Sequence, residues 1–374
     1  MQRCLAAMTI FAGFFAATMP ARPVLASGLR PLGGFDIQDG PVINLAWSPD
    51  GVHLAYCGTD GCHIAEAATG KITANMSGAG GPIAGGGQGV IGFSPDGSTL
   101  ILPSLQNDND HFLTFWNTKT GARAGSVGLL PEQRGDGSAA IASTAADGLS
   151  FAALSNGGGA QPALVYSLPG LKQLQAIRPG PDDLTIAIAL SPDGRAIAMS
   201  RNHDAIVTYD IATGRLAGRV GYHADLDVEP ISGLSYSPDG KYLAAGFSNG
   251  GKVQLRGPGN TLLTVPNPWP TPPIYIWRLD HGVPYGKPRE LCGAQPQGVL
   301  NMLWTKNSRA VIFTDGYGGT KLCPLTGAPA TTILQKDDSS GEVPALSPTG
   351  DRLAIGADAR IDIFALPDAD TKEN

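Results

Sequence analysis

The chain has 374 residues, of which 51 are Gly and 30 are Pro, while 42% are hydrophobic and 16% are charged. The hydrophobic share is enough for a core, which excludes an intrinsically disordered chain, and Gly and Pro penalise helix interiors, which argues against a helical bundle. The formal net charge of −6 argues against nucleic acid as a partner, because proteins bind its phosphates through Lys and Arg.

Residues 1–26 have the pattern of a secretory signal peptide. Arg3 precedes an apolar run from Cys4 to Met19, and Val24-Leu25-Ala26 precedes Ser27 as a small-residue cleavage site. The alternative, a membrane anchor, is disfavoured because the run is short and Pro20 and Arg22 interrupt it. Cleavage removes two of the 26 basic residues and none of the 32 acidic ones, so the formal net charge changes from −6 to −8. We expect a periplasmic or secreted protein with no membrane span after cleavage.

A short turn motif repeats along the remaining chain. The steps between successive copies are 46, 51, 46, 46, 68 and 42 residues. In each full copy Pro presets φ, Asp caps its own backbone and Gly accepts a positive φ, so each copy joins two strands. The full copies are Ser48-Pro49-Asp50-Gly51, Ser94-Pro95-Asp96-Gly97, Ser191-Pro192-Asp193-Gly194 and Ser237-Pro238-Asp239-Gly240, and the degenerate copies begin at Ala145, Thr305 and Ser347.

Strands flank every turn. Large and small residues alternate before it, as in Ala46-Trp47, and an apolar strand follows it, as in residues 54–56, 99–102, 196–199 and 242–245. A third strand comes next, for example residues 112–117, 206–210 and 274–277, and it usually ends in a Thr-Gly turn. A fourth, weaker strand leads to the next unit. Four antiparallel strands per unit of about 50 residues are typical of a β-propeller blade.

The Ser-Pro-Asp-Gly turn and the aromatic-polar pairs Trp116-Asn117 and Tyr209-Asp210 resemble WD40 repeats and the related TolB-type repeats. The Gly-His and Trp-Asp pairs of strict WD40 blades are absent. The resemblance covers nearly the whole mature chain and implies an all-β, seven-bladed propeller of four-stranded antiparallel blades over residues 27–368, followed by a polar tail at 369–374. We expect residues 32–37 to supply the outer strand of the last blade and so close the ring and hide an edge.

Four cysteines remain after cleavage, and an even number in an oxidising compartment favours disulfides. Cys57 and Cys62 flank a hairpin turn, so we expect them to pair, and Cys292 then pairs with Cys323. Unpaired buried thiols are the alternative. Four residues separate Cys57 from Cys62, whereas a covalent haem site needs two, so we expect no haem.

The fifth unit carries an insertion between Phe247 and Ile274. In the family geometry this loop shares a face of the ring with the links between blades. A Trp among prolines loses little entropy on docking, so we expect a contact surface for a protein or peptide; the alternative is a rigid spacer. The candidate partner-binding residues are Arg256, Pro266, Pro268, Trp269 and Pro270 in the insertion, with His223, Asp225 and Asp227 in the preceding link.

Neither a metal nor a cofactor is expected. The acidic stretches 106–111 and 223–229 lack the spacing of a calcium loop, and the His residues are too scattered for a zinc site. Four residues before each turn, where inner strands line the channel, only Asn44 and Asn301 are polar, and no residue is ionisable. We therefore expect a monomeric, non-enzymatic protein-binding scaffold. The alternative is an enzyme or small-ligand binder of the lactonase or quinoprotein kind, with its ligand at the mouth of the channel.

Overall fold

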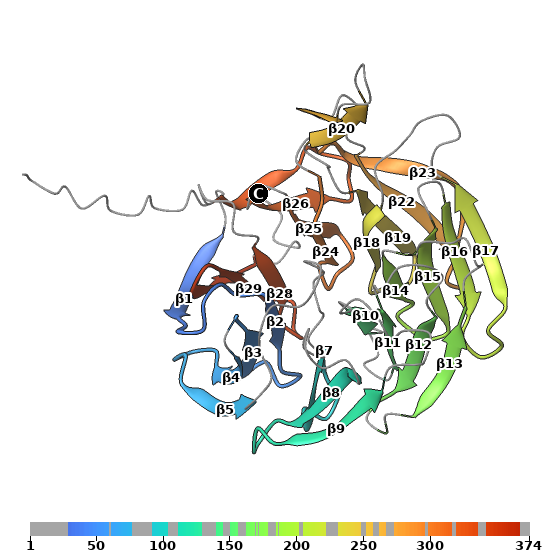
Figure 1. The fold of residues 1–374 in the computed structure, drawn as a ribbon. Helices are drawn as coiled ribbons and strands as arrows, with labels where there is room; N and C mark the ends of the chain where they lie inside the picture. The colour runs from blue at the N-terminus through green and yellow to red at the C-terminus, as the bar shows by residue number, and fades with distance from the viewer. Residues whose placement is uncertain are drawn as a thin grey trace, which may run out of the picture.

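In the computed structural model the chain forms a ring of seven sheets, each with four antiparallel strands (Figure 1). The described part of the chain contains strands and turns and no helix. The described residues are 29–59, 61–76, 92–103, 111–128, 140–144, 150–155, 162–168, 170, 172–178, 185, 187–201, 205–221, 231–247, 252–256, 262–266, 273–295, 298–315, 319–335 and 342–366. The expected signal peptide and the polar tail lie outside them.

The first four blades follow the chain order without interruption. Blade 1 contains β2 (Asn44–Trp47), β3 (His53–Cys57), β4 (Cys62–Glu66) and β5 (Ile72–Met76). Blade 2 contains β6 (Gly92–Phe93), β7 (Thr99–Pro103), β8 (His111–Asn117) and β9 (Arg123–Gly128). Blade 3 contains β10 (Ala140–Thr144), β11 (Ser150–Ser155), β12 (Ala163–Ser167) and β13 (Gln173–Ile177). Blade 4 contains β14 (Ile188–Leu190), β15 (Ala196–Arg201), β16 (Ala205–Asp210) and β17 (Leu216–Gly221).

The last three blades include one insertion and one strand from the start of the chain. Blade 5 contains β18 (Ile231–Tyr236), β19 (Tyr242–Phe247), β22 (Pro273–Asp280) and β23 (Val283–Ala294), and its insertion forms a separate sheet of β20 (Lys252–Arg256) and β21 (Leu262–Pro266). Blade 6 contains β24 (Asn301–Trp304), β25 (Ala310–Thr314), β26 (Gly319–Pro324) and β27 (Thr331–Gln335). Blade 7 contains β28 (Val343–Leu346), β29 (Arg352–Ala357), β30 (Arg360–Ala365) and, as its outer strand, β1 (Arg30–Asp36).

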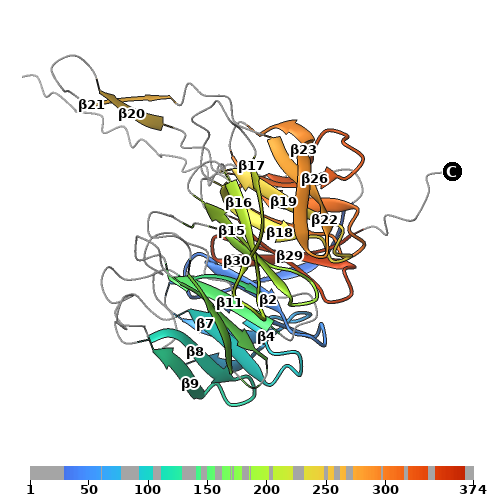
Figure 2. The same ribbon diagram turned by 90° about the vertical axis from the view of Figure 1, so that its right-hand side faces the viewer.

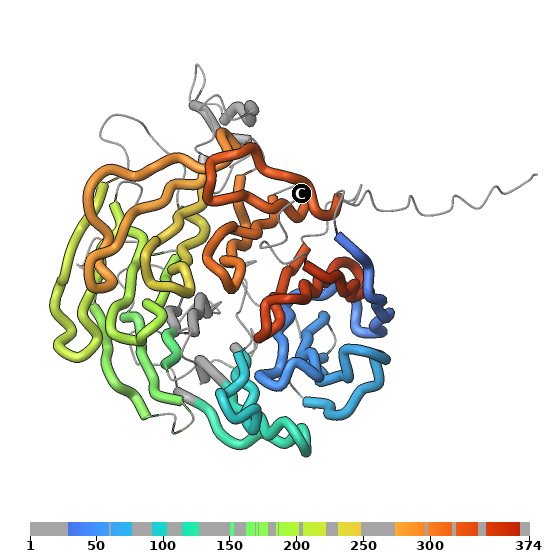
Figure 3. The backbone as a smooth tube through the Cα atoms, turned by 180° about the vertical axis from the view of Figure 1, so that it is seen from behind, coloured from blue at the N-terminus to red at the C-terminus, as the bar shows by residue number. Residues whose placement is uncertain are grey.

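The ring is closed by β1, as the sequence predicts. This strand pairs antiparallel with β30, from Arg30 opposite Ala365 to Asp36 opposite Arg360. Arg360 also donates to the carboxylate of Asp36 at 2.7 Å. Figure 3 shows the N-terminal strand in blue beside the C-terminal strands in red. Joining the two ends of the chain in one sheet hides the edge of β30.

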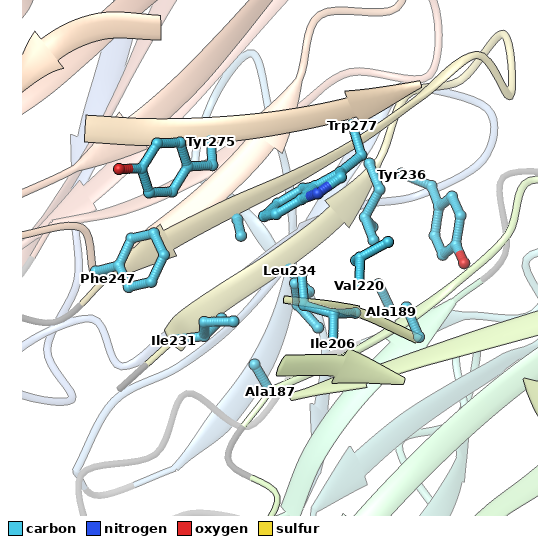
Figure 4. Packing of buried hydrophobic residues seen from close by; sticks show 13 residues of the cluster. Ala187, Ala189, Ile206, Val220, Ile231, Leu234, Tyr236, Phe247, Tyr275 and Trp277 are labelled. Atoms are coloured by element: carbon cyan, nitrogen blue, oxygen red, sulfur yellow. The ribbon is translucent and has the colours of Figure 1, made fainter. Parts of the chain in front are cut away.

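Buried side chains fill the spaces between neighbouring blades. Between blades 4 and 5, Trp277 is fully buried and packs in one cluster with Ile206, Val220 and Tyr275 (Figure 4). Inner strands are also joined by side chains: the indole Nε1 of Trp47 donates to the carbonyl of Ala345 at 3.1 Å, and that of Trp304 to the carbonyl of Ser235 at 3.0 Å. These two large residues before the turns therefore join blade 1 to blade 7 and blade 6 to blade 5.

Candidate functional site

The strand register divides the ring into two faces. In blade 5, Ile231 at the start of β18 lies opposite Phe247 at the end of β19, so the incoming link and the insertion share one face. Asn301 lies opposite Thr314 in the same way in blade 6. We call this side the link face. The other side carries the repeated turns, and we call it the turn face.

The turn face is held by one repeated arrangement of hydrogen bonds. In blade 5, Ser237 donates to the carboxylate of Asp239 at 2.7 Å and accepts from the backbone N–H of Tyr242 at 2.9 Å, and Gly240 has a φ of +69°. Blades 1, 2, 4 and 7 repeat the bond from a backbone N–H to the turn Ser, at 2.9 to 3.0 Å. These residues therefore stabilise the turns themselves.

A cleft of about 570 Å³ opens between the turns of blades 1 and 2. Its lining includes the turn carboxylates Asp50 and Asp96, the imidazole of His53 and the ammonium group of Lys119. The pKa of Asp50 is lowered by its hydrogen bond to Ser48, and that of Asp96 by its hydrogen bond to Ser94. These acids already serve their own turns, which makes the cleft a poor candidate for a ligand site.

On the link face the insertion of blade 5 forms a hairpin of its own. The strands pair from Lys252 opposite Pro266 to Arg256 opposite Leu262. The hairpin β20–β21 extends away from the ring in Figure 2. Arg256 and Pro266 of the expected contact surface are thus the last residues of β20 and β21. The other candidates, Pro268, Trp269, Pro270, His223, Asp225 and Asp227, lie outside the described residues, and their grouping with the hairpin stays a prediction.

Two disulfides are present with the pairings that the sequence suggests. Cys57 and Cys62 join the link-face ends of β3 and β4, with a Cα–Cα distance of 4.1 Å. Cys292 and Cys323 join the outer strand of blade 5 to β26 of blade 6, with a Cα–Cα distance of 5.8 Å. The first bond constrains one hairpin, whereas the second ties two blades together.

Beside the first disulfide, His63 connects blade 1 to the link that follows the closing strand. Its Nε2 lies 3.1 Å from the carboxylate of Asp39, and its Nδ1 lies 2.7 Å from the side-chain oxygen of Asn75. Burial and the charge of Asp39 raise the pKa of the neighbouring Tyr56 to about 12. The backbone carbonyl of Asp39 also accepts from the hydroxyl of Thr59 at 3.1 Å. This group fixes the link to blade 1.

A second polar group lies between blades 6 and 7, where sequence reasoning expected only Asn301. The amide of Asn301 donates to the hydroxyl of Thr314 at 3.0 Å and to the backbone carbonyl of Glu342 at 3.1 Å. Thr320 donates to the carboxylate of Glu342, which is only 1% exposed. The sequence analysis considered the fourth residue before each turn, and Glu342 is the fifth, directly before β28, so this buried acid was missed.

The adjoining loop of blade 6 is held by a buried ion pair. Lys321 Nζ lies 2.8 Å from the carboxylate of Asp315, which also accepts from the backbone N–H of Gly319 at 2.9 Å. A side chain at Gly319 would meet Gln335 at 2.8 Å. Asp315 and Glu342 therefore both bond to groups of the ring itself. Together these bonds stabilise the contact of blade 6 with blade 7.

Sequence reasoning also missed a cleft of about 290 Å³ beside blade 6, on the outer part of blade 5. Its lining combines aromatic and cationic side chains. Tyr242 on its floor stacks on Trp304, with ring centroids 6.2 Å apart. The lining residues are Tyr242, Ile276, Arg278, Tyr285, Gly286, Lys287 and Arg289. We call this site the basic cleft. The pairing of β22 with β19 and with β23 brings these residues together, so no single sequence motif points to the cleft.

Two general searches gave negative results. Among the described residues, no three His, Cys, Asp or Glu side chains are grouped as a metal ion would require. The same part of the chain has no helix that is long and apolar enough to cross a membrane.

Comparison with known families supports the repeat. The family model for the WD domain, G-beta repeat, matches residues 223–255, which include β18 and β19 and end in β20. In the blade, however, β19 pairs with β22, so the insertion interrupts the repeat between its second and third strands. No curated protein matches the chain. The matched repeat and the seven four-stranded blades together support the resemblance of the chain to the WD40-like β-propeller family.

Proposed function

We propose that this chain is an exported, monomeric scaffold that binds a protein or peptide partner through the link face of blade 5. The observation that carries the proposal is the hairpin β20–β21, which forms a sheet outside the seven blades. A pair of strands that contributes nothing to its own blade is free to contact another molecule. The family argument agrees, since WD40 propellers generally bind proteins, although fold alone supports function only by analogy.

The ring of seven blades, which we call the frame, is suited to this role because it is rigid where the hairpin joins it. The insertion leaves from β19 and returns to β22, whose residues Phe247 and Ile274 are 1% and 0% exposed. The disulfide from Cys292 to Cys323 ties the outer strand of the same blade to blade 6. A binding element held on a rigid base loses less entropy on docking.

Export is supported by the two disulfides, because such bonds persist in oxidising compartments. The pattern of residues 1–26 points the same way. The mass of the protein recovered from the envelope or the medium tests this part. We expect a mature chain that begins at Ser27; a full-length chain recovered from the cytoplasm would contradict it.

Site-specific photo-crosslinking tests the binding role. A photoreactive residue replaces Gln254 in β20 or, as a matched control, Leu216 in β17, which is 58% exposed. In native envelope or medium we expect the same discrete crosslinked species from position 254 in repeated preparations and none from position 216. Equal crosslinking from both positions, or none from position 254, would overturn the proposal.

A further inference from the structure

The basic cleft holds three cations on one side of blade 5. Arg278 in β22 lies opposite Tyr285 in β23, and Ile276 lies opposite Arg289. A register shift between these two pairs leaves Lys287 in a bulge of β23, beside Gly286 with a φ of +71°. Tyr285, Lys287 and Arg289 of β23 all line the cleft together with Arg278 of β22. The bulge thus gathers three exposed cations around one cleft.

These charges have no acidic counterpart in the described structure. Among the described residues no carboxylate forms an ion pair with Arg278, Lys287 or Arg289, and Arg289 donates to the backbone carbonyl of Leu325 at 2.9 Å. The nearest acids on these strands are Asp280, two residues from Arg278 and beside His281, and Glu290, opposite Tyr275, and neither forms an ion pair with the three cations. The whole chain has a formal net charge of −6. The local excess of positive charge therefore belongs to this site and does not follow from the overall composition.

The rest of the cleft is apolar and fixed in place. Ile276 and Tyr242 belong to the cluster that packs blade 5 on blade 6, and Tyr285 is 50% exposed at the rim. The disulfide between Cys292 and Cys323 holds β23 against blade 6 just beyond the cations. A ligand therefore meets an aromatic wall beside the charges, and the wall needs little ordering on binding.

The spacing of the cations favours an extended chain of carboxylates over a single small anion. Arg289 lies opposite Ile276, two residues before Arg278 on β22, so Arg278 and Arg289 are offset along the sheet by about 6.6 Å at the rise of a β-strand. Carboxylates on alternate residues of an extended peptide have the same spacing. Recognition must come from side chains, since Pro284 and Pro288 lack the N–H groups that adding a strand to β23 would need.

We propose that the basic cleft binds an acidic peptide segment of the partner protein, with carboxylates beside an aromatic or aliphatic side chain. This inference rests on the proposed scaffold function and adds the chemistry of the partner. The hairpin leaves the link-face end of blade 5, whereas Tyr242, Arg278 and Tyr285 of the cleft lie at its turn-face end. A partner that contacts both must therefore extend along the outer side of the blade.

The test uses a fluorescein-labelled peptide in which Glu alternates with Tyr and Leu, and it measures fluorescence anisotropy with the mature protein. The variant Arg278→Gln with Lys287→Gln removes two charges that make no bond within the described structure, so folding is not at risk. The matched control is Arg195→Gln, an arginine that is 83% exposed on the turn face. We expect the Kd to rise about tenfold in the double variant and to stay unchanged in the control.

Further binding measurements distinguish an acidic peptide from other ligands of the cleft. A peptide with Gln in place of Glu should bind at least about tenfold more weakly, and added salt should weaken binding of the acidic peptide. No binding of the acidic peptide to the wild type, or an equal loss in the Arg195 control, would overturn the proposal. Displacement by inorganic phosphate, at a concentration where chloride of the same ionic strength has no effect, would make the site one for small anions and would also overturn it.

The crosslinking experiment at position 254 keeps the two proposals distinguishable. If position 254 gives no crosslink but the acidic peptide still binds in a charge-dependent way, the proposed role of the hairpin is wrong and the proposed role of the cleft stands. If position 254 still crosslinks but the acidic peptide does not bind, only the proposal for the cleft is wrong.

Discussion

The two faces of the ring differ in how far their residues repeat from blade to blade. On the turn face the same residues recur and bond to one another, as Ser94 does to Asp96 at 2.6 Å and Ser191 to Asp193 at 2.7 Å. On the link face, three blades carry three different features: blade 1 has a disulfide and His63, blade 5 has a hairpin, and blade 6 has an ion pair between Lys321 and the buried Asp315. The repeated residues therefore maintain the frame, and departures from the repeat are where binding is to be sought.

This comparison predicts that changes to the frame lower stability, whereas changes to the hairpin or the basic cleft alter binding alone. The largest effect is expected from the closing strand. Removing residues 27–40 takes away the pairing of β1 with β30 and the buried Ile37. We expect the free energy of unfolding to fall by about 4 kcal/mol or more, measured by denaturant titration. Removal of the polar tail 369–374 serves as the control, and an equal effect of the two deletions would refute the closure argument.

The two disulfides should differ in their effect. The sequence separation is 31 residues for Cys292 and Cys323 and 5 for Cys57 and Cys62, and a longer closed loop restricts the unfolded chain more. Replacing both members of a pair by Ser should cost about 3.5 kcal/mol for the first and about 2 kcal/mol for the second. Thermal unfolding of both double variants checks the order, and a larger loss from the Cys57–Cys62 pair would show that strain or packing dominates.

A single turn should contribute less. Ser237 is fully buried and bonds to both Asp239 and the backbone of Tyr242. Ser237→Ala should lower the free energy of unfolding by about 1 kcal/mol, because two hydrogen bonds are lost and the cavity is small. Ser232→Ala, at a partly buried hydroxyl outside the repeated turn, is a useful comparison.

The smallest effect is a dependence on pH. Hydrogen bonds from Ser48, Ser94 and Thr213 lower the pKa of Asp50, Asp96 and Asp210 below 3.8. Since the carboxylates are favoured in the folded state, their contribution is complete above the ordinary pKa and is lost as the pH falls through the lowered values. The destabilisation by Ser94→Ala should therefore be larger at pH 7 than at about pH 3. An effect independent of pH would show that the charge of Asp96 does not matter.

The sequence predicts the frame better than the sites, for a physical reason. A local turn such as Ser237-Pro238-Asp239-Gly240 is encoded by adjacent residues, and its recurrence counts the blades. The closing strand follows from the unpaired segment near residues 32–37, and the structure contains it as β1. By contrast, the 68-residue step between turns reveals the insertion, but the sequence does not predict its pairing of Lys252–Arg256 with Leu262–Pro266. The basic cleft and Glu342 depend on register and on neighbouring blades, which local patterns do not encode.

The central claim is that the hairpin binds the partner and is not needed for the stability of the ring. It is tested most directly by replacing residues 252–266 with a short Gly-Ser linker and measuring both the melting temperature and the capture of the partner that crosslinks at position 254. We predict a melting temperature within the scatter of the wild type and loss of capture, whereas Ser237→Ala should lower the melting temperature and retain capture. Undiminished capture by the linker variant would contradict the account.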